Sequence, residues 1–83
     1  MRAIFHAVIT NDDGLLESTL TEYAEELHWE MLKNFQNTTP LHCAAQRGNV
    51  TNCKLLLDMI GEDGLNLKDN MDRTPVMVYN DIK

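Results

Sequence analysis

The sequence has little of what builds disulfide scaffolds, metal sites or membrane spans. Its two cysteines, Cys43 and Cys53, are too few for a disulfide framework. Neither they nor the three histidines show the close ligand spacing of a zinc site. No apolar run approaches the roughly 20 residues that span a bilayer, and the N-terminal residues carry no secretory signal. We therefore expect no metal site, no membrane insertion, and core thiols typical of an intracellular, cytoplasmic or nuclear protein.

Basic residues are scarce, and the first third of the chain has almost none. The chain carries 13 acidic and 7 basic residues, a net charge of −6. Residues 1–30 hold seven acids and a single base, Arg2, so this third accounts for the whole imbalance. Such a surface repels phosphate backbones and anionic lipid, which argues against nucleic acid as a partner. The acids form either a solvated helix face or a docking surface for a basic partner.

Catalytic signatures are also missing. Ser18 is the only serine and stands among acidic residues without a histidine partner at useful spacing. The two glycines Gly61 and Gly64 lack the strand-turn-helix context of a phosphate loop. The carboxylates lie on a solvated face instead of forming a buried pair. We therefore expect a protein that is not an enzyme and has no cofactor.

The strongest local pattern runs from Thr39 to Ile60. Thr39 followed by Pro40 is typical of a helix start, and Gly48 ends that helix in a left-handed conformation. Asn49 then caps a second helix, whose apolar residues recur at helical spacing: Val50, Cys53, Leu56, Leu57 and Ile60. The sequence predicts a short helix, a tight turn and a longer antiparallel helix, followed by a non-helical stretch from Gly61.

The same helix entry returns 35 residues later, where residues 74–76 (TPV) repeat residues 39–41 (TPL). A period of about 33 residues is typical of helical solenoids. Residues 39–48, TPLHCAAQRG, resemble the ankyrin signature TPLHxAAxxG, and residues 65–75 resemble the family's hairpin and re-entry. The chain is thus similar to the ankyrin repeat family. The resemblance implies an all-α solenoid of helix-turn-helix pairs joined by short β-hairpin loops.

His42 has a structural explanation within this pattern. It follows Thr39 by three residues, so its ring can hydrogen-bond back to the helix cap and reach the loop of the neighbouring repeat. We expect this role for His42 in place of a catalytic one.

The resemblance divides the chain into two repeats and the start of a third. Residues 1–33 form a degenerate repeat, residues 34–68 a well-matched repeat, and residues 69–83 a truncated repeat. In the first repeat, apolar residues continue at helical steps as far as Met31, which predicts a second helix extended by about one turn.

Two further expectations concern turns and ends. Asn11, Asn37 and Asp72 stand where the family usually has glycine, and asparagine tolerates the left-handed conformation better than most residues. No polar second helix closes the third repeat. Residues 74–83 therefore belong to a longer array, pack unusually, or pair with another molecule, self-association through this uncapped end included.

The resemblance implies a module that binds a partner protein through hairpin fingers and the concave face of the first helices. Carried over residue by residue, the partner-binding positions are Lys33, Phe35, Gln36, Thr38, Gln46, Arg47, Lys68, Asn70, Met71 and Arg73. Phe35, Arg47 and Arg73 are the expected anchors, and the cations suit a partner with acidic groups. Each position has the alternative of an exposed loop residue without contacts. The alternative for the whole chain is a structural segment that supports neighbouring repeats of a longer ankyrin array.

Overall fold

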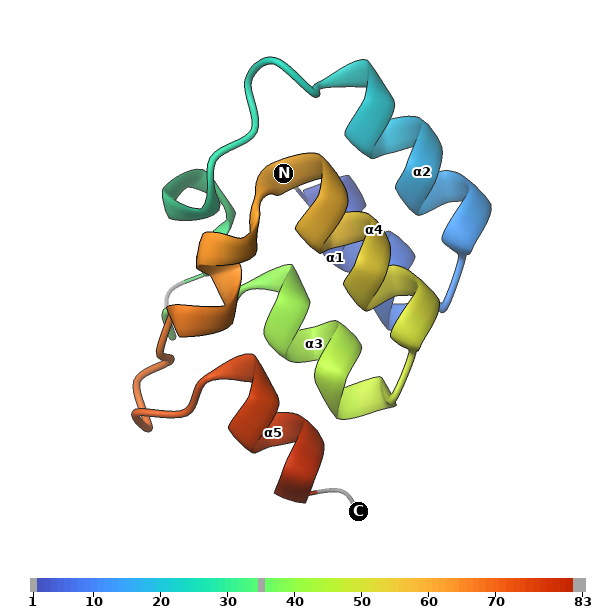
Figure 1. Ribbon diagram of the computed structural model, residues 1–83. Helices are drawn as coiled ribbons and strands as arrows, with labels where there is room; N and C mark the ends of the chain where they lie inside the picture. Colours follow the sequence, from blue (N-terminus) through green and yellow to red (C-terminus); the bar gives the residue numbers. More distant parts are fainter. Residues whose placement is uncertain (1, 35, 82–83) are drawn as a thin grey trace.

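Five α-helices and two short 3-10 helices follow one another in the computed structural model, which describes residues 2–34 and 36–81 (Figure 1). In chain order they are α1 (Arg2–Ile9), α2 (Asp13–Glu22), η1 (Trp29–Leu32), α3 (Pro40–Arg47), α4 (Val50–Ile60), η2 (Glu62–Asn66) and α5 (Pro75–Asp81). The described residues form no strand, so the connections between helix pairs are turns. The predicted all-α solenoid is confirmed.

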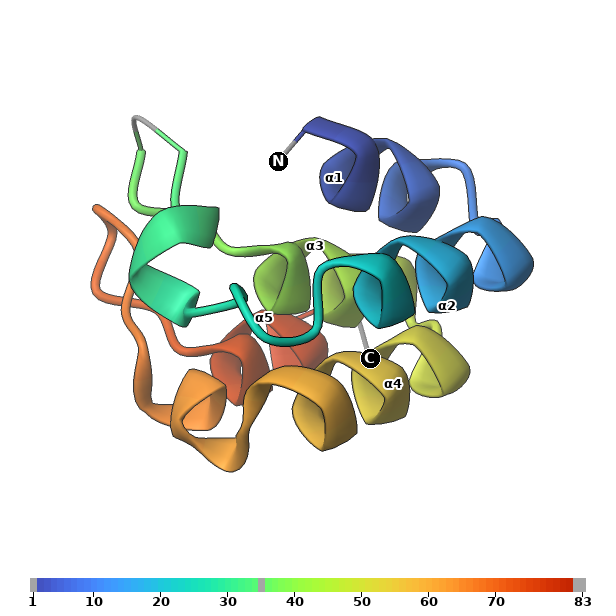
Figure 2. The ribbon, with the colours of Figure 1, turned by 90° about the horizontal axis from the view of Figure 1, so that it is seen from above.

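The helices form two rows. α1, α3 and α5 follow one another as an inner row, and α2 and α4 lie side by side as an outer row (Figures 1 and 2). Each outer helix contacts the inner helix that precedes it in the chain, and neighbours within a row also contact each other. α5 has an inner neighbour in α3 but no outer helix following it within the described residues.

Side-chain caps begin α2, α3 and α4, and the caps of α3 and α4 are the predicted residues Thr39 and Asn49. Asp12 accepts a hydrogen bond from the backbone N–H of Leu15, and Thr39 accepts one from His42. Asn49 does the same for the first turn of α4, and Gly48, at φ 69°, ends α3 in the left-handed region. These caps satisfy N–H groups that a helix start leaves unpaired. The helix-turn-helix predicted between residues 39 and 60 is confirmed.

The core lies between the two rows. It is one hydrophobic cluster drawn from the first four helices and the segment after α2: Ile4, Ala7, Val8, Leu16, Leu20, Leu27, Trp29, Leu32, Leu41, Ala44 and Leu56. Alanines at positions 44 and 45 are buried, which allows the backbones of the neighbouring helices to approach α3 closely. The four glutamates of the first repeat's outer side, Glu17, Glu22, Glu25 and Glu26, are exposed.

The prediction of an extended second helix in the first repeat is wrong. α2 ends at Glu22, and residues 23–26 form turns. Leu27 and Trp29 leave the helical path and enter the core, where the indole Nε1 of Trp29 donates to the carbonyl of Gly61 at 2.9 Å. A continued helix would also place acids at its negatively polarised C-terminal end. Leu27 and Trp29 are therefore apolar because they are buried in the core, and the segment that carries them does not continue α2.

The segment after α4 also differs from the prediction. Gly61 ends α4 at φ 135°, but residues 62–66 then form the 3-10 helix η2 where a non-helical stretch was predicted. η2 contacts both α4 and α5 and so closes the gap between them at one end. Gly64 within it is buried against the indole ring of Trp29.

Within residues 2–34 and 36–81, three residues other than glycine have positive φ, and all three stand at the expected glycine positions. They are Asn11 (57°), Asn37 (57°) and Asp72 (59°). The left-handed conformation strains most side chains, and asparagine and aspartate bear it best. The chain therefore keeps the turn geometry without the glycines.

Asn52 is a buried amide without a protein partner. It lies on α4 with no exposed surface, and no described residue is within hydrogen-bond distance of its Oδ1 or Nδ2. An unsatisfied buried polar group costs about 1–3 kcal/mol.

Candidate functional site

Two loops with the same hydrogen-bond pattern lead into α3 and α5. We call residues 33–39 finger one and residues 68–74 finger two. In finger one, the Oδ1 of Asn34 accepts hydrogen bonds from the backbone N–H groups of Gln36 (2.8 Å) and Thr38 (3.0 Å). The N–H of Asn34 donates to the carbonyl of Thr38 at 3.0 Å. A single amide side chain thereby holds the whole turn. The expected anchor Phe35 lies outside the described residues.

Finger two repeats these contacts 35 residues later, with Asp69 in the place of Asn34. Asp69 Oδ1 accepts from the N–H groups of Met71 (2.9 Å) and Arg73 (3.0 Å). Its Oδ2 binds the Arg73 guanidinium, at 3.1 Å from Nε and 3.0 Å from Nη2. Burial alone raises the pKa of Asp69, but these N–H groups and the guanidinium outweigh it and hold the pKa below its ordinary value.

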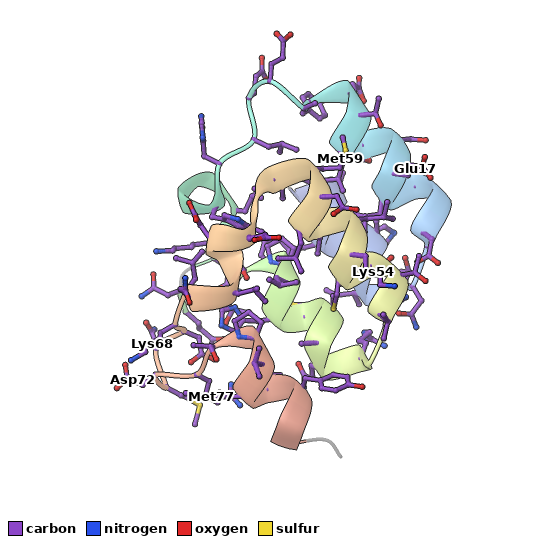
Figure 3. All side chains as sticks on the ribbon, in the orientation of Figure 1. Glu17, Lys54, Met59, Lys68, Asp72 and Met77 are labelled. Atoms are coloured by element: carbon purple, nitrogen blue, oxygen red, sulfur yellow. The ribbon has the colours of Figure 1, made fainter. Side chains whose placement is uncertain are left out.

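The two fingers are bonded to each other. The backbone N–H of Asn70 donates to the carbonyl of Gln36 at 3.0 Å, and the side-chain amide of Asn37 donates to Asn70 Oδ1 at 2.7 Å. Figure 3 shows Lys68 and Asp72 at the outer end of finger two, with Met77 close by at the start of α5. The fingers thus form one continuous surface.

His42 connects the first helix of one repeat to the finger of the next, as predicted. Its Nδ1 accepts from the backbone N–H of Thr39 (3.2 Å) and lies 2.9 Å from the Thr39 hydroxyl. Its Nε2 lies 2.7 Å from the carbonyl oxygen of Arg73. A carbonyl can only accept, so Nε2 carries the hydrogen and Nδ1 is the acceptor. The imidazole therefore fixes finger two to the start of α3.

A groove between the fingers gathers five of the predicted binding residues. It has a volume of about 160 Å³ and is lined by Gln36, Thr38, Asp69, Asn70, Met71 and Arg73. Among the large hydrophobic side chains whose exposure the structure describes, Met71 is the most exposed, at 72%. We call this the finger groove. It places an apolar side chain between two amides and a guanidinium.

The other predicted residues lie elsewhere. Gln46 and Arg47 line a second groove of about 480 Å³ on the inner row, together with Ile9 and Cys43. Lys33 is half-buried and Lys68 exposed, and neither lines the finger groove. The predicted set is therefore divided between two places.

Sequence reasoning missed Ile9, Cys43 and Asp69 as lining residues. Ile9 is offset from Gln46 by the same 37 residues that separate Ile4 from Leu41, so the alignment of the first two repeats already indicated it. Cys43 and Cys53 are free thiols, and burial raises the pKa of both. For Cys43 the charge of Arg47 offsets part of that rise.

The charge of finger two is more balanced than the sequence suggested. Arg73 is already paired with Asp69, and Asp72 stands beside Lys68 at the outer end (Figure 3). The expected attraction for acidic partners therefore rests mainly on Arg47 in the second groove. Glu17, one of the acids on α2, lies away from finger two, since Figure 3 places Glu17 and Lys68 on opposite sides of the molecule.

Replacing Asp69 should separate the role of its oxygen from that of its charge. Asn34 shows that an amide oxygen holds the same turn. We expect Asp69→Asn to cost under about 1 kcal/mol of unfolding free energy at pH 7. Asp69→Ala, which leaves two N–H groups without their acceptor, should cost about 2 kcal/mol. Urea unfolding followed by circular dichroism measures both.

The pH dependence gives a second readout. A carboxylate with a depressed pKa contributes stability above its ordinary pKa of about 3.9, and this contribution is lost as the pH falls through the lower folded-state value. The difference between the wild type and Asp69→Asn should therefore shrink between pH 5 and pH 2. An equal cost for both variants, or a difference that does not change with pH, would show that Asp69 does not hold the finger in this way.

Two further observations bear on what the surface can do. No group of three or more histidine, cysteine, aspartate or glutamate side chains is placed to hold a metal ion within residues 2–34 and 36–81. None of the described helices is long and apolar enough to cross a membrane.

Comparison with known proteins identifies the family. The model of the family described as ankyrin repeats (3 copies) matches residues 4–78, which is most of the chain. No curated protein and no solved structure was found to match. Members of this family are generally non-catalytic and generally mediate protein–protein interactions. With its two rows of helices, its paired fingers and this match, the chain belongs to the ankyrin repeat family.

Proposed function

We propose that the chain is a non-catalytic module that binds a partner protein through its fingers and the inner row of helices. The observation that carries this proposal is the finger groove, where Met71 is 72% exposed among polar groups. Interfaces are enriched in methionine and arginine at their centres, with amides able to hydrogen-bond around them.

The groove favours a particular partner chemistry. Gln36 and Asn70 offer amide groups at the edges, and Met71 offers a flexible apolar contact. The guanidinium of Arg73 is held in place by Asp69, so it costs little side-chain entropy to use. We infer a partner segment with one apolar side chain for Met71 and carbonyl oxygens for Arg73 and the amides.

We also propose the boundaries of the three repeats and the cellular location of the chain. The division into repeats at residues 1–33, 34–68 and 69–83 is supported by the equivalent bonds of the two fingers. An intracellular location is supported by two free, half-buried thiols, which a reducing compartment keeps unpaired.

A second candidate is a structural segment that supports neighbouring repeats of a longer array. The observation that favours it is the exposed apolar surface on α4 and α5, where Val50 and Val76 are each about half exposed. A segment of this kind would use its ends, whereas a binding module uses its fingers.

The experiment is a selection of short random peptides on the immobilised chain, followed by measurement of dissociation constants for the selected peptides. The test variants are Met71→Ala and Arg73→Gln, and Leu15→Ala is the control because it is an exposed apolar residue on α2 away from the fingers. We expect both finger variants to weaken binding about tenfold or more, as interface anchors do, and the control to leave it unchanged.

Two outcomes would contradict the proposal. One is that no selected peptide loses affinity in the finger variants while circular dichroism shows them folded. The other is that Leu15→Ala weakens binding as much as they do. In either case the fingers are not the binding surface, and the structural role becomes the better description.

A further inference from the structure

Met71 supplies the apolar contact of the finger groove, and its thioether is open to solvent. The side chain is 72% exposed and shares the groove with Gln36, Asn70 and Arg73. Oxidation of a methionine thioether to a sulfoxide turns a flexible apolar side chain into a polar one. The side chain that a partner would contact here is therefore one whose polarity an oxidant changes.

The groove around Met71 also holds hydrogen-bond donors that the fold leaves unused. The side-chain amide nitrogens of Gln36 and Asn70 have no partner among residues 2–34 and 36–81. Arg73 uses Nε and Nη2 on Asp69, which leaves its Nη1 without a partner among the same residues. A thioether sulfur accepts hydrogen bonds only weakly. A sulfoxide oxygen on Met71 would add an acceptor to a groove that is lined by these donors.

Two other methionines provide the comparison. Met77, at the start of α5, is 48% exposed and does not line the finger groove. Met59, on α4, is half-buried and packs against the hydrophobic core (Figure 3). Oxidation of sulfur follows its exposure to solvent. The order of exposure therefore predicts that Met71 is oxidised first, Met77 next and Met59 last.

We propose that Met71 is a reversible oxidation site and that its sulfoxide releases the partner from the finger groove. This inference rests on the proposed function and adds regulation to the same surface. With hydrogen peroxide as the oxidant, the sulfur attacks one peroxide oxygen, so that a sulfur–oxygen bond forms and the oxygen–oxygen bond breaks. The sulfur loses two electrons to the peroxide. The proton of the attacked oxygen passes to the leaving hydroxide, which departs as water.

The new oxygen weakens binding in two ways. The side chain becomes polar, so it no longer suits the apolar side chain that we propose for the partner. The sulfoxide oxygen also engages donors of Gln36, Asn70 and Arg73, which the partner's carbonyl oxygens need. The fold itself should not change, because Met71 is exposed and lies outside the core cluster. Methionine sulfoxide reductases restore the thioether, which makes the change reversible.

The test uses a peptide selected on the reduced chain and chosen because Met71→Ala weakens its binding. The chain is treated with limiting hydrogen peroxide, mass spectrometry of its fragments locates the sulfoxides, and dissociation constants are measured before and after. We expect Met71 to be oxidised before Met77 and Met59. The dissociation constant should rise about tenfold or more once Met71 is a sulfoxide. Treatment with reductases for both sulfoxide epimers should restore the original value.

Two leucine variants show which sulfur is responsible. Met71→Leu has no thioether in the groove, so its dissociation constant should be the same before and after peroxide, whatever its starting value. Met77→Leu is the matched control and should show the full rise of the wild type. Burial raises the pKa of the Cys43 and Cys53 thiols, which keeps them in the less reactive protonated form. Oxidation of either thiol would also affect Met71→Leu, so the same comparison excludes it.

Three results would overturn the inference. One is that the wild type, with Met71 shown to be a sulfoxide and its circular dichroism unchanged, binds the peptide as before. Another is that Met71→Leu loses as much affinity in peroxide as the wild type does. The third is that Met77 or Met59 is oxidised while Met71 stays a thioether. All three leave the proposed function standing. That function fails on a different result, in which Met71→Ala and Arg73→Gln weaken no selected peptide, and this inference then fails with it.

Discussion

Replacing His42 with leucine should lower the free energy of unfolding by about 2–3 kcal/mol, because buried groups lose their partner without a substitute. The imidazole accepts from the N–H of Thr39 and donates to the carbonyl of Arg73. Leucine fills a similar space but can do neither. The Thr39 N–H is then left unpaired, and the Arg73 carbonyl keeps only the N–H of Asp69. Urea unfolding at neutral pH measures the loss.

Met77 provides the control for His42. It is the residue 35 positions later, at the same place in α5, and it is exposed. Met77→Leu should change the free energy of unfolding by no more than about 0.5 kcal/mol. A loss below about 1 kcal/mol in His42→Leu would mean that the finger stays in place without the imidazole. The bonds of Asn37 and Asn70 and the packing of α3 against α5 would then hold finger two in place.

Replacing Gly64 with alanine should cost about 2–3 kcal/mol, for a reason that involves space and not backbone conformation. A Cβ built on Gly64 would overlap the indole of Trp29 at Cε2, Cζ2 and Cη2. The ring cannot simply move aside, since its Nε1 is bonded to the carbonyl of Gly61 at 2.9 Å. Either that bond breaks or η2 shifts away from the indole.

Gly14 is the matched control for Gly64. It lies in α2, and a Cβ there would meet only Asp12 Oδ1 at 3.7 Å, which is ordinary contact. Gly14→Ala should therefore stabilise the chain by about 0.5–1 kcal/mol through helix propensity. In a Trp29→Leu background, the cost of Gly64→Ala should fall to under about 1 kcal/mol, which a double-mutant cycle detects. If the full cost persists there, the overlap with the indole is not its cause.

The sequence predicts the second repeat and its neighbours in detail because their signals are local. Thr39, Pro40 and Gly48 set the bounds of α3 through caps and backbone preference, which act within a few residues. The link from His42 to the next finger follows from the same resemblance. The positive φ values of Asn11 and Asp72 follow from their place in the repeat. Each of these needs no knowledge of distant packing.

The first repeat was harder to predict because its last residues are positioned by contacts far away in the chain. Spacing alone could not distinguish a continued helix from a turn that buries Leu27 and Trp29 separately. The hydrogen bond from Trp29 to the carbonyl of Gly61, 32 residues later, determines the path of this segment. The burial of Asn52 on α4 likewise depends on how the helices pack against one another.

The division of the candidate binding residues into two grooves has the same origin. The resemblance placed Gln46 and Arg47 with the finger residues, since the family uses both. In the fold, the finger groove and the groove of Arg47 are separate, and Ile9 of the first repeat completes the latter. Which residues share a groove depends on the packing of α1 against α3, and no motif records it.

Trp29 is the only tryptophan of the chain, and it is buried where the segment after α2 meets the end of α4. Its fluorescence therefore has a single structural source. A buried, hydrogen-bonded indole emits at shorter wavelength than one in water, so a red shift reports that the first repeat has separated from the second. If this shift precedes the loss of helical circular dichroism during unfolding, the acidic first repeat detaches before the rest of the stack melts. Repeat proteins held together only by neighbouring contacts can lose their ends in this order.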